Sequence, residues 1–321
     1  MSEQEHSKCP SCGYRTAPED LACSLCGAVL RRSEAPEPVV QQPSREEAEE
    51  KAERLGTLKL AGITFGISAV LVWFTSMASR ESASMFISLV GFIGFIFRYL
   101  AVLVHEMGHA VFAWIFGYPA VPAFDLTYGG GVTIWQDRKV LLVLGVYALF
   151  ATAFTIFGIS RNRSGLIFTG VVLVLFAFLA HTSGHDVVIL FMGHGTELLF
   201  AGLALYRMLS RSAIINPAER PLYGVIGWFM VLDSIRFGLS LVYSPAARYE
   251  YGAAKGGGHW MDFDRIASDH LGISLEPVAL FFALCALAVP AVSFAAWLFA
   301  QKWKSWVEDI LFIDLHRLGL R

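Results

Sequence analysis

The feature that most constrains this chain is a succession of apolar segments, each about as long as a bilayer is thick. A helix needs about 20 apolar residues to cross the hydrocarbon core, and we count about seven segments near that length. Only 16% of the 321 residues are charged, against about 25% in a typical soluble protein. The sequence therefore predicts an all-α polytopic membrane protein with about seven transmembrane helices. The segments run over residues 58–78, 86–116, 139–159, 165–181, 186–209, 222–244 and 277–300.

Composition divides the chain into four parts. The cysteine-rich residues 1–30 predict a zinc ribbon, and the charged, proline-rich residues 31–57 predict a linker that runs into a polar helix. Residues 58–300 form the predicted membrane domain. Residues 301–321 mix tryptophans with lysines, which is typical of a helix that lies at the membrane interface. The net charge of −2 gives no reason to expect a nucleic-acid partner.

Four of the five cysteines form two CxxC pairs ten residues apart, at Cys9, Cys12, Cys23 and Cys26. A glycine follows each pair, and this pattern is typical of tetrahedral thiolate coordination of a structural Zn²⁺. Two disulfides in an exported segment are the alternative. Thiolate zinc sites belong to reducing compartments, so we expect a cytosolic N-terminus. The ribbon is also a candidate contact for a protein partner.

Residues 105–109 read His-Glu-Met-Gly-His and lie inside the second apolar segment. On a helix this motif sets two imidazoles one turn apart on one face, with a carboxylate beside them. His105 and His109 would bind a catalytic Zn²⁺, and Glu106 would act as the general base on its water. Two buried, hydrogen-bonded histidines are the alternative. Ionisable groups at membrane depth are costly, which favours the functional interpretation.

A catalytic zinc needs a third protein ligand and keeps one position open for water. The first candidate is His194, because Asp186, His194 and Glu197 form a polar stripe along the fifth apolar segment. In this stripe Glu197 is an alternative ligand and Asp186 a supporting polar group. A hydrogen-bond network between helices would also explain the stripe. Asp262, before the last apolar segment, is a second alternative ligand, although it fits the start of a helix as a capping residue as well.

Residues 124–135 follow the motif and are β-prone and rich in glycine. They predict a short β-hairpin at the membrane surface, with a plain loop as the alternative. A free strand edge there would bind an extended substrate by β-addition.

These features resemble the bacterial branch of the site-2-protease family of intramembrane zinc metallopeptidases. The resemblance rests on the His105–His109 motif, the glycine-rich segment after it and a later helix with a polar motif. In that family an asparagine lies eight residues before the metal-binding aspartate of a Leu-Asp-Gly motif. Asp186 and His194 have this spacing. A second match, Met261-Asp-Phe-Asp-Arg-Ile266, resembles the Leu-Asp-Gly-Gly-Arg-Ile form and keeps the aspartate at Asp262.

The resemblance implies an enzyme of regulated intramembrane proteolysis, which we expect in a bacterial inner membrane. Its substrates would be transmembrane or membrane-proximal segments of other proteins, unwound locally for hydrolysis. Glu106 would take a proton from the metal-activated water and later give it to the leaving amine. The alternative function is a catalytically inactive membrane adaptor whose zinc ribbon recruits a partner. A metal transporter is a weaker hypothesis, because the motif gives it no special support.

Overall fold

The computed structural model describes residues 7–16, 20–30, 45–78, 84–125, 130–254 and 261–313. The chain divides into two compact units, residues 1–53 and residues 54–321. In the first unit, β1 (Ser7–Lys8) pairs antiparallel with β2 (Arg15–Thr16). An isolated bridge joins Ala22 to Val29 further along. Each of these pairings closes a turn that carries one CxxC pair.

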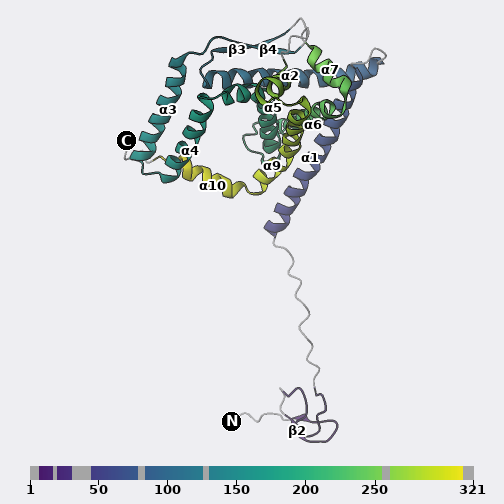
Figure 1. The fold of residues 1–321 in the computed structure, drawn as a ribbon. Coiled ribbons are helices and arrows are strands. Elements are labelled where there is room, and N and C mark those ends of the chain that lie inside the picture. The colour runs from purple at the N-terminus through teal and green to yellow at the C-terminus, as the bar shows by residue number, and fades with distance from the viewer. Residues whose placement is uncertain are drawn as a thin grey trace. The chain divides into compact units, whose positions relative to one another are not determined.

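Within the described residues, seven helices are long and apolar enough to cross a membrane, in agreement with the prediction of a helical, polytopic chain. Figure 1 shows how they are arranged. They begin and end within a few residues of the predicted segments. The exception is the first helix. It begins at Arg45, so the predicted polar helix and the predicted segment 58–78 form one continuous helix. The seven are α1 (Arg45–Ala78), α2 (Met85–Ile115), α3 (Val140–Ile159), α4 (Arg163–Ala180), α5 (Gly184–Ser210), α6 (Glu219–Tyr243) and α9 (Leu275–Leu298).

The spanning helices expose apolar side chains, as helices in contact with lipid must. Helix α3 fully buries only Val143 and exposes apolar side chains, among them Leu141 and Leu149. Helix α4 likewise exposes Val174 and Phe178. Apolar patches on soluble monomers seldom exceed a few hundred Å², and a helix that is apolar all round belongs in a core or in lipid. The structure thus supports an integral membrane protein.

Helix α5 lies at the centre of the packed core, against α2, α6 and α9. Helices α2 and α5 are antiparallel, because His109 contacts Ile189 while His105 contacts Glu197. They approach closely where α2 carries Gly108: a Cβ there would lie 2.2 Å from the carbonyl oxygen of Met192. In lipid, burial of apolar surface contributes little to the association of helices. Small residues at such contacts let the helices approach closely, and close packing then stabilises the pair.

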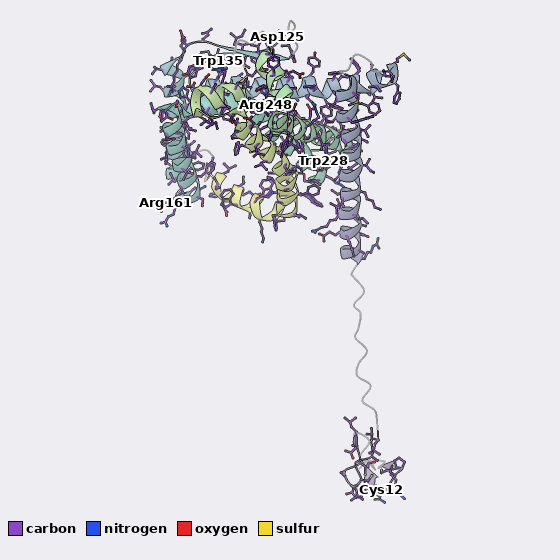
Figure 2. The ribbon with its side chains drawn as sticks, turned by 45° about the vertical axis from the view of Figure 1, so that its right-hand side comes forward. Cys12, Asp125, Trp135, Arg161, Trp228 and Arg248 are labelled. Atoms are coloured by element: carbon purple, nitrogen blue, oxygen red, sulfur yellow. The ribbon has the colours of Figure 1, made fainter. Side chains whose placement is uncertain are left out.

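A short hairpin lies between α2 and α3, as predicted. Strand β3 (Ala120–Phe124) pairs antiparallel with β4 (Gly131–Trp135), with Ala120 opposite Trp135. Its first strand begins earlier than the predicted segment 124–135, of which residues 126–129 lie outside the described part. Both strands pack on α2. Figure 2 labels Asp125 and Trp135, which lie at opposite ends of this hairpin.

The chain then returns to the core between α6 and α9. It passes through α7 (Pro245–Ala253), α8 (Asp262–Arg265) and a π-helical turn (Ile266–Leu271), with residues 255–260 outside the described part. The fully buried ring of Phe263 packs in the same cluster as Leu190 and Phe282. Its backbone N–H donates to the hydroxyl of Tyr251 at 3.2 Å. These contacts fix the start of α8 and therefore the position of Asp262.

The last helix, α10 (Ala300–Leu311), begins one residue before the predicted interfacial segment 301–321, of which residues 314–321 lie outside the described part. The side-chain amide of Asn162 donates to the carbonyls of Asp309, Ile310 and Phe312. This ties the end of α10 to the start of α4 (Figure 1). Its exposed Trp306 fits the predicted interfacial position.

Candidate metal centre

The HExxH motif lies on α2 at the wall of a cavity of about 910 Å³. The motif leaves Glu106 and His109 only 6% and 4% exposed. Strand β4, α5, α6 and the start of α8 supply most of the remaining wall. Helix α2 continues through the motif without a break. The side chains of His105, Glu106 and His109 all line this one cavity.

Three donor atoms meet at this wall. The Nε2 atoms of His105 and His109 are 2.9 Å apart, and Asp262 Oδ2 lies 3.1 Å and 3.2 Å from them. Ligands of a tetrahedral zinc with bonds of about 2.0–2.1 Å lie roughly 3.3 Å from one another. The three atoms therefore fit one face of a zinc coordination sphere, and this group is one of those that can hold a metal ion.

In each ring, Nδ1 has a hydrogen-bond partner of its own, and Nε2 is the nitrogen that faces the candidate metal position. His109 Nδ1 lies 2.8 Å from the carbonyl oxygen of Ile189, and His105 Nδ1 lies 2.8 Å from Glu197 Oε1. Both partners are acceptors, so with a metal ion on Nε2 each ring would keep its proton on Nδ1 and donate it to these oxygens. Carbonyl and carboxylate partners of this kind orient and strengthen metal-binding histidines.

Helix α5 reaches these rings because residue 193 is a glycine. A Cβ at Gly193 would lie 2.4 Å from His109 Nε2 and 2.7 Å from His105 Cε1. No side chain fits there without moving the imidazoles. The glycine thus brings the carbonyl of Ile189 and the carboxylate of Glu197 to the two rings.

Strand β4 holds the Glu106 carboxylate. The hydroxyl of Thr133 donates to Glu106 Oε2 at 2.6 Å and lies 3.0 Å from the Glu106 carbonyl oxygen. The Glu106 side chain also lies over Gly131, where a Cβ would be 2.3 Å from Glu106 Cγ. Neither contact is visible in the HExxH pattern, yet together they set where the expected general base points.

The charge of Asp262 is stabilised by the site. Burial raises the pKa of its carboxyl, but the imidazoles of His109 and His105 outweigh burial and hold that pKa well below its usual range. Burial, and after it the charge of Asp262, raises the pKa of the Tyr251 hydroxyl well above its usual value. An anionic Asp262 beside two imidazoles is the donor set that a divalent cation requires.

The geometry favours Asp262 over His194 as the third ligand. Sequence reasoning ranked His194 first because it lies on an apolar segment, whereas Asp262 had the simpler explanation of a helix cap. In the structure His194 belongs with His105 and Glu197 to a second group of donors that excludes His109. The reason is tertiary: α8 folds back so that Asp262 faces both Nε2 atoms.

His194 instead lies in an aromatic cage. Its ring packs against those of Phe237, Phe263 and Phe282, and 4.4 Å from the ring of His105. Its Nδ1 is buried without a hydrogen bond among the described residues, with Glu197 Oε1 3.6 Å away. Glu197, the other alternative ligand, bonds to the Nδ1 edge of His105 and acts as an orienting partner.

Asp186 does not belong to the cavity wall. It lies in the first turn of α5, where its Oδ1 is 3.4 Å from His185 Nε2. The hydroxyl of Tyr118 is 2.9 Å from the same nitrogen. The predicted supporting role of Asp186 at the metal therefore has no geometric support, because eight residues of helix separate it from His194 by about 12 Å.

The four N-terminal cysteines form a separate group that can hold a metal ion. The Sγ atoms of Cys9 and Cys26 are 3.7 Å apart and those of Cys12 and Cys23 are 3.6 Å apart. Sulfurs on a tetrahedral zinc are roughly 3.8 Å apart at bonds of about 2.3 Å. A disulfide would need about 2.05 Å, and all four are free thiols. The N–H of Cys26 lowers the pKa of the Cys23 thiol to about 7, which favours the thiolate.

Glycines shape both cysteine turns. Gly13 and Gly27 have φ values of +74° and +71°, and each N–H donates to the carbonyl of the first cysteine of its pair at 2.8 Å. A side chain is disfavoured in this left-handed region. The glycine after each CxxC pair, noted in the sequence, is therefore what lets each turn present two sulfurs to one point.

No protein-family model, no curated protein and no solved structure matches this chain. The two groups are therefore identified as candidate metal sites from donor type and geometry alone.

Proposed function

We propose that this chain is an intramembrane zinc metalloprotease that cleaves transmembrane or membrane-proximal segments of other proteins. The observation that carries the proposal is the convergence of His105 Nε2, His109 Nε2 and Asp262 Oδ2 beside the buried carboxylate of Glu106. The seven helices of spanning length among the described residues support a site that works within a membrane. The cavity supports access for water and for a segment of substrate.

His105, His109 and Asp262 would hold the catalytic zinc, with Glu197 and the Ile189 carbonyl orienting the rings. Bound there, zinc would supply Lewis acidity and lower the pKa of a coordinated water toward neutrality. The donor set leaves one tetrahedral position for that water, as a catalytic site requires. His194, held in its aromatic cage, would take no part in coordination.

Glu106 would act as general base and then as general acid. Its carboxylate accepts the proton of the attacking water as the water adds to the scissile carbonyl, and it then gives the proton to the leaving amine. The Thr133 hydroxyl keeps one carboxylate oxygen in place, at 2.6 Å. This leaves the second oxygen for the proton transfer.

Strand β4 would hold the substrate. Within the described residues β4 pairs with β3 alone, so its other edge offers backbone donors and acceptors. All five of its residues line the cavity that contains the metal-binding group. A substrate helix that has unwound would regain hydrogen bonds by adding to this edge as a strand.

The N-terminal unit would carry a second, structural zinc on its four cysteines. Because thiolate zinc sites belong to reducing compartments, we propose a cytosolic N-terminus. The bacterial inner membrane is proposed from the family resemblance alone. We assign the ribbon to contact with a protein partner and not to nucleic acid, because the net charge of the chain is −2.

The test is a single substitution at the general base. Purified protein would be reconstituted into vesicles with single-span membrane proteins, and the products would be identified by mass spectrometry. We expect Glu106→Gln to lower the cleavage rate at least about 100-fold, because general acid–base catalysis contributes that much, while bound zinc is retained.

The matched control is Glu308→Gln, which changes an exposed carboxylate on α10. We expect it to cleave as the unmodified protein does. An unaltered cleavage rate in Glu106→Gln would disprove the proposed mechanism. Zinc binding without any cleavage by the unmodified protein would instead favour the inactive adaptor.

A further inference from the structure

An arginine shares the cavity with the metal-binding group. Arg98 lies on α2 and lines the cavity with its exposed side chain. Seven residues separate it from His105, which is close to two helical turns. Arg98, His105 and His109 therefore lie on one face of the helix, with Arg98 about 10 Å along the axis from the nearer ligand.

The position of Arg98 along α2 carries a high free-energy cost for a charged guanidinium. Helix α2 has 31 residues, so it is about 45 Å long, and Arg98 is about 20 Å from its first residue. In a bilayer whose hydrocarbon core is about 30 Å thick, that is near the middle of the span. Arginines at such depth face protein or water, find a partner and usually mark a functional site.

Among the described residues, Arg98 has no such partner. Its side chain makes no hydrogen bond or ion pair with any residue that the structure describes. Other charges of the cavity are engaged: Asp233 Oδ1 accepts from Arg236 at 2.7 Å, and Asp262 faces the two histidines. Arg265, the other cavity arginine, lies over the ring of Trp135 at 6.0 Å.

We propose that Arg98 is a specificity-determining residue that binds a carboxylate of the substrate. The inference rests on the proposed protease function and adds to it a substrate class: membrane segments that carry an acidic group. Along an extended substrate, 10 Å corresponds to about three residues. The acidic group therefore lies about three residues from the scissile bond. A charge-assisted pair with the substrate would offset the cost of the guanidinium at that depth.

The experiment measures binding without cleavage. The protein carrying Glu106→Gln is placed in lipid nanodiscs, with fluorescent single-span peptides of leucine and alanine as probes. One series carries a single aspartate moved along the central ten or so positions, and a matched series carries asparagine. A third arm compares a free C-terminal carboxylate with its amide, which separates the two sources of a carboxylate.

We expect one aspartate position to bind at least about tenfold more tightly than asparagine, since a hydrogen bond to a charged group contributes that much. Adding Arg98→Gln should abolish this preference, and Arg98→Lys should keep part of it. Arg98→Glu should reverse the preference in favour of a lysine peptide. Arg163→Gln, at an exposed arginine outside the cavity, is the control and should keep the aspartate preference.

Three results would overturn the inference. They are equal binding of aspartate and asparagine peptides, an equal loss of both in Arg98→Gln, and a preference that follows only the anionic lipid content of the nanodisc. The last result would assign Arg98 to a lipid phosphate. Failure of the protease proposal is distinguishable, because an Arg98-dependent aspartate preference without any Glu106-dependent cleavage would retain the binding role alone.

Discussion

At the scale of single residues, His105 is the centre of the site because its two nitrogens have different partners. Nε2 faces His109 and Asp262, whereas Nδ1 faces Glu197. A ring that binds a metal through one nitrogen must donate a proton from the other, and a carboxylate is a strong acceptor for it. This division gives Asp262 and Glu197 different roles, although both are acidic residues near the same histidine.

We predict that Asp262→Asn removes the catalytic zinc while His194→Phe retains it. Loss of an outer partner of a metal ligand lowers metal affinity about 10–100-fold, so loss of a direct ligand should cost more. Phenylalanine suits the aromatic cage of residue 194. Zinc affinity would be measured by competition with a chelator. Retention of zinc in Asp262→Asn together with its loss in His194→Phe would restore the first sequence-based assignment.

At the scale of elements, the site depends on close contacts of α2 with α5 and with β4. Gly193 lets α5 reach the histidines, and Gly131 lets β4 reach Glu106. Neither glycine has a positive φ, so the need at both positions is for space and not for backbone freedom. Helix α5 and strand β4 therefore contribute to the site through the absence of a side chain at one glycine each, as well as through their polar groups.

We predict that Gly131→Ala impairs catalysis and spares metal binding. Its Cβ would lie 2.3 Å from Glu106 Cγ and 2.4 Å from Glu106 Oε1, so the carboxylate must move. A displacement near 1 Å can cost about 100-fold in rate. Cleavage rate and zinc content would be measured side by side. The control is Gly145→Ala on α3, where no atom lies within 4 Å of the added Cβ. Equal rates in both variants would contradict the prediction.

At the scale of the whole molecule, the described residues include two separate groups of donors that could hold a metal ion, one in each unit. The cysteine group lies entirely within residues 1–53, and the histidine group lies entirely within residues 54–321. The units share no ligand, so loss of one site should leave the other occupied.

We predict that the paired substitution of Cys9 and Cys12 by serine removes about one zinc per chain and leaves the other bound. Intact-protein mass spectrometry under native conditions counts the ions. Combination with Asp262→Asn should remove both. Loss of both ions from the cysteine variant alone would show that the two groups do not bind independently.

The sequence by itself determined the helices, the motif and the ribbon. Apolar length sets helix bounds, because a membrane forces the backbone to satisfy its own hydrogen bonds. The four-residue spacing of His105 and His109 sets their common face, and the CxxC pairs bring sulfurs together locally. These features involve residues close in sequence, so local geometry is enough to predict them.

Only the tertiary structure decided which distant residues meet the motif. Asp262 lies 157 positions beyond His105, and Thr133 lies 27 positions beyond Glu106. Their arrival depends on how α8 folds back and how β4 packs on α2. Periodicity ranked His194 above Asp262, because a polar stripe on a helix is visible in sequence. The space that Gly193 opens for α5, and the direction in which each ring then points, follow from packing between elements.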